Sequence, residues 1–158
     1  MHYCKIKTDD IANGPGVRVS LYVSGCPHRC KGCFNPETWD YNAGKPFTEK
    51  EIQKIIDSLK PEYISGLSLL GGEPLAEQNR KEVALLVQKI KELFPDKTIW
   101  CWTGFLYEDL LSERVKDENL SYLLDNLNVL IDGPFIESQK DLSLHYCGSK
   151  NQKVYFLN

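Results

Sequence analysis

A stretch with three cysteines, residues 24–35, constrains this chain more than any other feature. Cys26, Cys30 and Cys33 are separated by three and then two residues, so three thiols of one short loop can reach a single metal centre. Glycine and proline residues in the stretch permit the tight curvature that this requires. Because thiolate is a soft ligand, a cysteine-only set selects zinc, copper(I) or an iron–sulfur cluster over calcium or magnesium. We interpret the stretch as an iron–sulfur loop.

The number of cysteines in the loop indicates an incomplete ligand set. A closed four-iron cluster normally has four cysteine ligands, whereas this loop supplies three and no further C-x-x-C pair follows. One iron of a [4Fe–4S] cluster would then be free to bind a small molecule, as in a catalytic site. The alternative is a structural zinc site formed by the three cysteines with His2, His28 or His145, since Cys₃His is an ordinary zinc ligand set.

Length and composition indicate one soluble globular domain covering residues 1–158. The chain is too short for an eight-stranded TIM barrel of about 250 residues. A net charge of −3 without a basic patch argues against binding to nucleic acid or to an anionic membrane. There is no apolar stretch of the roughly 18 residues that a membrane span needs, and no signal segment, so we expect a cytoplasmic protein. In that reducing compartment the clustered cysteines are expected to bind metal or take part in catalysis. Cys4, Cys101 and Cys147 are expected to be buried structural residues, although Cys4 or Cys147 could lie near the site.

Beyond residue 16 the pattern alternates between strands and helices. Alternation and apolar runs predict strands at 17–23, 67–70, 98–102, 129–131 and 153–157, whereas the first dozen residues are expected to be irregular. A capping box at residues 48–51 starts a helix that Pro61 ends, and further helices are predicted at 75–94, 106–111 and 120–127. This order predicts an α/β fold, an open partial (βα) barrel of about five to six mostly parallel strands.

The loops after these strands carry the unusual residues of the chain. They are Gly25-Cys26, residues 71–74, Thr103-Gly104 and residues 132–134. In parallel α/β proteins the loops after the carboxyl ends of the strands lie on one side and carry the site. The four loops are therefore expected to meet around the cysteines.

The cysteine spacing, together with Gly71-Gly72-Glu73-Pro74 about 40 residues later, resembles the signature of the radical S-adenosylmethionine (SAM) enzymes. The resemblance implies a barrel of the radical SAM type and a [4Fe–4S] cluster on the three cysteines. It implies that SAM binds the fourth iron through its amino and carboxylate groups and is cleaved to a 5′-deoxyadenosyl radical. It also implies that the turn at 71–74 clamps the SAM amino group through its backbone and its acidic side chain.

Some positions depart from that pattern or match it less specifically. Many members have an aromatic residue before the third cysteine, against the adenine. Here this residue is Gly32, so no side chain at this position can pack on the adenine, although the backbone at Gly32 and Cys33 could still contact it. Phe34 could shield the cluster, pack in the core or contact adenine. Thr103 and Asp132 occupy positions similar to those where relatives bind SAM polar groups or a monovalent cation, although Asp132 also suits a turn before Gly-Pro.

Several other polar and aromatic residues are left out of the predicted site. Arg18, Arg29 and Lys31 are expected to be solvated, as long basic side chains usually are. His28 and Trp39 are expected to pack within their loops.

Within this family the chain is similar to the glycyl radical enzyme activases, and most similar to those that act on anaerobic (class III) ribonucleoside-triphosphate reductase. The resemblance covers nearly the whole chain, at residues 13–18, 26–35, 38–39, 71–75, 132–135 and 148–152. It implies hydrogen abstraction from a glycine of the large reductase subunit, an unidentified electron donor and no side-chain acid or base. The alternatives are an activase of pyruvate formate-lyase or another glycyl radical enzyme, and a metal-binding interaction module without enzymatic activity.

Overall fold

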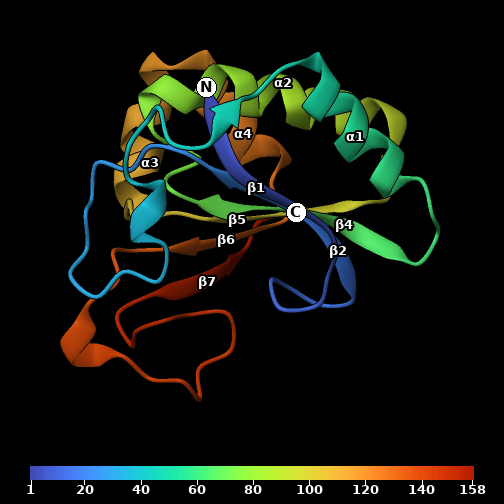
Figure 1. Cartoon of the computed structure of the whole chain (residues 1–158). Helices are drawn as coiled ribbons and strands as arrows, with labels where there is room; N and C mark the ends of the chain where they lie inside the picture. The colour runs from blue at the N-terminus through green and yellow to red at the C-terminus, as the bar shows by residue number, and fades with distance from the viewer.

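The computed structural model describes all residues 1–158 and shows a seven-stranded sheet with helices on one face (Figure 1). The strand order is β3-β1-β2-β4-β5-β6-β7. The strands are β1 (His2–Asp10), β2 (Val17–Val23), β3 (Lys45–Pro46), β4 (Ile64–Gly71), β5 (Thr98–Trp102), β6 (Val129–Asp132) and β7 (Lys153–Phe156). The helices are α1 (Glu49–Leu59), α2 (Glu77–Leu93), α3 (Tyr107–Glu113) and α4 (Glu118–Asn126), with short 3₁₀ turns at Pro36–Thr38, Arg114–Lys116 and Glu137–Gln139.

The four central strands are parallel and follow one another across the sheet. β2 pairs with β4, β4 with β5 and β5 with β6, each through a helical crossover. Because such crossovers are right-handed, a strand order that advances in one direction places every helix on the same face. The predicted α/β class is confirmed, and the opposite face of the sheet is left free for a site.

The outer strands correct two sequence expectations. The sheet has seven strands where about five to six were expected, because β1 and β3 were not identified in the sequence. These two strands and the predicted β7 form the antiparallel pairs at its edges. Residues 2–10, expected to be irregular, form the long strand β1. The register between β1 and β2 shifts twice, between Tyr3 and Lys5 and between Lys7 and Asp10. These irregularities interrupt the alternation that would have identified the strand.

The four helices lie where their sequence signals place them, with boundaries that differ by up to two residues. In α1 the Thr48 side chain and Glu51 form the predicted capping box, and the apolar stripe of this helix is buried. Helix α2 begins at Glu77, two residues later than expected, since residues 74–76 remain part of the turn after β4. No helix is both long enough and apolar enough to cross a membrane.

Alternation along the central strands divides the sheet into two different faces. The face under the helices is built from fully buried apolar residues, namely Val19, Leu21, Val23, Leu67, Leu69, Ile99, Cys101 and Leu130. The other face presents Arg18, Ser20, Tyr22, Ser68, Trp100, Trp102 and Ile131. We call these the helix face and the cavity face.

The segment between β6 and β7 lies on the side of the sheet away from the helices (Figure 1). Trp102 Nε1 donates to the Tyr146 carbonyl at 2.7 Å, and the Tyr146 ring meets that of Trp100 edge-on at 4.8 Å. These contacts hold residues 133–152 over part of the cavity face.

Candidate functional site

A cavity of about 470 Å³ opens at the carboxyl ends of the parallel strands. All four loops that the topology places at this end contribute to it: Cys26, Cys30 and Cys33 after β2, residues 71–73 after β4, Thr103 and Gly104 after β5, and Gly133 after β6. The residues with the strongest sequence signals, far apart in the chain, therefore surround one space.

The cysteine loop is tied to the segment that follows it. Gly25 N–H donates to the Thr38 carbonyl at 2.7 Å and Cys26 N–H to the Trp39 carbonyl at 3.1 Å. Gly25 has φ +92, and a Cβ there would lie 2.0 Å from the Tyr41 ring, so only glycine fits this entry to the loop.

The three thiols line the same cavity and are all partly exposed. Burial raises the pKa of the Cys26 thiol, and the charge of Glu73 raises it further. No three His, Cys, Asp or Glu side chains converge closely enough to hold one metal ion. Of the histidines considered as zinc ligands, only His28 lines the cavity, and its Nε2 lies 2.9 Å from Glu73 Oε2.

The turn after β4 lies in close contact with the cysteine loop because its glycines have no side chains. Gly71 has φ +104, and a Cβ there would lie 2.7 Å from Tyr22 Cα. A Cβ at Gly72 would lie 2.5 Å from the Gly25 carbonyl oxygen, which accepts a hydrogen bond from Glu73 N–H at 2.7 Å. Gly71, Gly72 and Glu73 line the cavity, whereas Pro74 does not.

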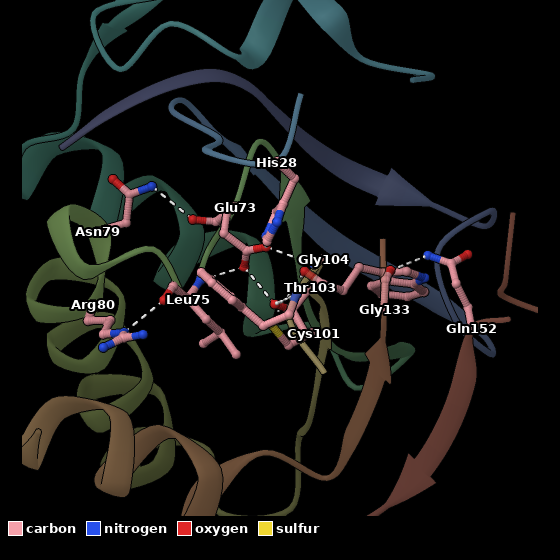
Figure 2. Close-up of polar contacts among 12 residues, drawn as sticks. His28, Glu73, Leu75, Asn79, Arg80, Cys101, Thr103, Gly104, Gly133 and Gln152 are labelled. Carbon is pink, nitrogen blue, oxygen red and sulfur yellow. Dashed lines mark hydrogen bonds and ion pairs between the residues drawn. The ribbon is translucent and has the colours of Figure 1, made fainter. Parts of the chain in front are cut away.

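The Glu73 carboxylate is fully buried and already saturated with internal contacts (Figure 2). Oε1 accepts from Leu75 N–H at 2.9 Å and from the Thr103 hydroxyl at 2.8 Å. Oε2 accepts from Gly104 N–H at 2.7 Å and contacts His28 Nε2. These four partners occupy the four lone-pair positions of a carboxylate. The acidic side chain thus joins three loops of the site.

Gly32 and Phe34 lie differently with respect to the cavity. Gly32 is not among its lining residues; it has φ +74, and a Cβ there would lie 2.8 Å from Glu137 Oε1. Phe34 does line it, is 56 % exposed, and packs against Phe135 at 5.0 Å between ring centroids.

Asp132 is buried at the end of β6 and bonds to the backbone. One carboxylate oxygen accepts from Tyr107 N–H at 2.9 Å, the other from Lys153 N–H at 3.2 Å. Asp132 does not line the cavity, although the neighbouring Gly133 does. Its carboxylate links helix α3 and strand β7 to the end of β6.

The structure adds lining residues that sequence reasoning left out of the site. They include His28 and Trp39, both expected to pack within their loops, and Tyr22, Trp102, Phe135, Tyr146 and Cys147. Alternation in β5 could have identified Trp102, because Trp100 and Trp102 face away from the buried Cys101. Nothing in the local pattern around Tyr146 or Cys147 indicates the cavity. Cys101 is buried as expected, whereas Cys4 and Cys147 are only partly buried.

Comparisons with known proteins identify the family of this chain. A family model described as a 4Fe-4S single cluster domain matches residues 12–155. An anaerobic ribonucleoside-triphosphate reductase-activating protein of Escherichia coli K12 is 43 % identical, over 99 % of both chains. Proteins of the same name from Vibrio cholerae and Enterobacteria phage T4 are 43 % and 41 % identical over 98 % of this chain, and over 97 % and 94 % of their own lengths. The chain therefore belongs to the family of anaerobic ribonucleoside-triphosphate reductase-activating proteins, with a 4Fe-4S single cluster domain.

Proposed function

We propose that residues 1–158 form a single radical SAM activase domain that generates the glycyl radical of an anaerobic ribonucleoside-triphosphate reductase. The observation that carries this proposal is the meeting of Cys26, Cys30 and Cys33 with the Gly71-Gly72 turn around one cavity, in a chain of this family. Helices cover one face of the sheet (Figure 1), and the residues that line the cavity lie at the carboxyl ends of its parallel strands. This arrangement supports an open partial barrel of the radical SAM type.

The residues at the cavity suit a [4Fe–4S] cluster. Three thiolates on one tetrahedral zinc, each at about 2.3 Å from the metal, would lie only about 3.8 Å apart. In a cluster each thiolate binds a different iron, so thiols that share a cavity without converging on one point fit the cluster better. The volume of about 470 Å³ also falls in the usual range for small-molecule sites.

Cys26, Cys30 and Cys33 would hold the cluster, which would supply the electron for cleavage of SAM to methionine and a 5′-deoxyadenosyl radical; this radical would take a hydrogen atom from a glycine Cα of the reductase. The protein positions the reactants and excludes water, without a side-chain acid or base. The backbone of Gly71 and Gly72 approaches the ligand closely, since neither residue has a Cβ. Phe34 and the backbone of Gly32 and Cys33 remain predicted contacts of the adenine or the cluster.

Two parts of this proposal rest on less specific signals. We keep Thr103 as a predicted contact of SAM, and Asp132 as the predicted position of a monovalent cation. Asp132 could share such an ion through the lone pairs that its two backbone donors leave free. Because cleavage consumes one electron, an external electron donor is also required.

The test is an anaerobic assay of the iron-reconstituted protein with SAM and dithionite, with and without the candidate reductase. We expect 5′-deoxyadenosine and a glycyl doublet in the electron paramagnetic resonance (EPR) spectrum of the reductase. Deoxyadenosine without the doublet would contradict the partner, and pyruvate formate-lyase would then be assayed in its place. Absence of both cluster and product would contradict the proposed chemistry.

A further inference from the structure

A largely buried histidine side chain at the centre of the cysteine loop connects the loop to Glu73. His28 lies midway between Cys26 and Cys30, and its Nε2 is 2.9 Å from Glu73 Oε2. The side chains of His28 and Glu73 are only 17 % and 1 % exposed. Figure 2 shows the imidazole directed at the carboxylate, on the side opposite Leu75. A carboxylate oxygen accepts, so Nε2–H donates this hydrogen bond.

The imidazole ring is also confined by its neighbours. A Cβ at Gly104 would lie 2.4 Å from His28 Cδ2, so the ring rests directly on the glycine backbone. The Phe105 ring meets it edge-on, with 4.5 Å between centroids and an interplanar angle of 74°. Because packing and the hydrogen bond both restrain it, the ring has one orientation.

Glu73 transmits this restraint to the rest of the site. The same carboxylate accepts from the Thr103 hydroxyl and from Gly104 N–H, and it thereby connects the cysteine loop with the loop after β5. Next to His28, Arg29 is in a left-handed conformation with φ +48. Surrounding contacts must maintain such a backbone, since it is strained for a residue other than glycine.

We propose that His28 is a positioning residue, whose hydrogen bond to Glu73 holds the cysteine loop so that Cys26 and Cys30 face the Gly71-Gly72 turn. This inference rests on the proposed function, because it concerns the geometry of the cluster ligands. In this proposal Glu73 acts by holding the loops of the site together, since all four acceptor positions of its carboxylate are filled by groups of the protein itself.

The main test compares His28→Phe with the wild type after anaerobic reconstitution. Phenylalanine keeps the edge contact with Phe105 and removes the donor to Glu73. Residues that orient metal ligands without binding the metal typically contribute 10- to 100-fold to metal affinity. We therefore expect His28→Phe to lose iron to a chelator at least about tenfold faster than the wild type. The EPR signal of the reduced cluster should also need about tenfold more SAM for its characteristic shift.

Two further comparisons distinguish a positioning role of His28 from general damage to the structure: rescue by a conservative variant, and combination with a variant of Glu73. His28→Gln restores a side-chain N–H donor and should recover most of the cluster retention, whereas the shorter His28→Asn should not. Glu73→Gln removes the carboxylate, and its effect should not add to that of His28→Phe, because contacting residues that act through each other are non-additive.

Lys31→Ala is the matched control in the same loop. Lys31 makes the other side-chain ion pair of the loop, at 3.3 Å to Glu137, but its side chain is 90 % exposed. An exposed pair contributes little, so iron loss and the SAM titration should stay within about twofold of the wild type.

The outcomes distinguish this inference from the proposed function. A wild type that retains neither cluster nor SAM contradicts the proposed function itself. A wild type that retains both, with His28→Phe indistinguishable from it, overturns only the role of His28. Equal defects in His28→Gln and His28→Asn would also overturn it. If His28→Phe does not fold, as judged by circular dichroism of the apo protein, the Gln and Asn pair provides the same test.

Discussion

The two faces of the central sheet have different chemistry although they alternate along the same strands. On the helix face Leu21, Leu69 and Ile99 are fully buried against the helices without polar partners. On the cavity face the neighbouring residues Ser68 and Arg18 are equally buried but bonded to other groups. Burial on the helix face therefore provides stability. On the cavity face Arg18 and Ser68 have hydrogen-bond partners for their buried polar groups, whereas the buried Ser20 Oγ has none.

Arg18 is the most extensively hydrogen-bonded side chain of the cavity face. Its guanidinium donates to Ser68 Oγ at 2.7 Å, Thr98 Oγ1 at 2.9 Å, and the carbonyls of Leu67 and Thr98 at 2.8 and 2.9 Å. Its Cζ lies 5.5 Å from the centre of the Trp100 ring. Burial lowers the pKa of Arg18 to about 10, so the group stays charged at neutral pH. Arg18 thus closes this part of the face, and the cavity opens at the carboxyl ends.

We expect the largest effect from a substitution that removes cluster binding at the cavity and leaves the stability of the apo protein nearly unchanged. Cys30→Ala removes one of three thiolates from a partly exposed loop. We expect no stable cluster and no 5′-deoxyadenosine, measured by iron content and product analysis after reconstitution. The free energy of unfolding of the apo protein should change by no more than about 0.5 kcal/mol, as for other substitutions outside the core. A large loss of apo stability would contradict the division between the faces.

A substitution on the helix face should instead lower the stability of the apo protein. Leu69→Ala deletes a fully buried side chain in the middle of β4 and should destabilise the protein by about 3 kcal/mol, because a cavity remains. Urea unfolding of the apo protein measures this loss. Leu142→Ala, at an 83 % exposed leucine, is the control and should stay within about 0.5 kcal/mol.

Arg18→Met sharpens the comparison by making the cavity face apolar at one point. The Leu67 and Thr98 carbonyls would lose their guanidinium donors, and unsatisfied buried acceptors cost about 1–3 kcal/mol each. Relief from burying a charge offsets part of this cost, so we expect a net loss of about 2 kcal/mol in urea unfolding. A more stable variant would show that desolvation of the guanidinium outweighs its hydrogen bonds.

We expect the smallest effect on stability from an ion pair between residues of the helix layer. Arg80 Nη1 lies 2.9 Å from Asp117 Oδ2. Burial raises the pKa of Asp117, but hydrogen bonds from Leu120 N–H and Arg80 outweigh it, and the net pKa lies below the usual 3.8. The contribution is therefore complete above about pH 4 and is lost as the pH falls through the folded pKa.

The measurement is urea unfolding from pH 6 to pH 3 for the wild type and Asp117→Asn, which keeps a good N-cap residue for α4. Because Asp117 is partly exposed, solvent screening limits the expected difference at pH 6 to about 0.5 kcal/mol. The two proteins should converge toward pH 3. A difference that is constant across this range would argue against titration of Asp117.

Much of the architecture was predictable from local patterns. The capping box at Thr48 and the apolar runs at 67–70 and 129–131 identified real elements, because each signal needs only neighbouring residues. Strand β1 was missed, since its register shifts disturb the alternation. Arg18 was expected to be solvated and is buried, because its acceptors come from β4 and β5, far away in the sequence.

The sequence by itself determined the parallel βαβ order, the position of the cysteine loop after a strand and the glycines that let two turns approach each other. These are consequences of periodicity and of backbone freedom, which act locally. Only the tertiary structure decided that His28 donates to Glu73, that Asp132 bonds to two backbone N–H groups and that Tyr146 reaches the cavity. These contacts join segments 20 or more residues apart, so they exist only once the sheet has brought its loops together.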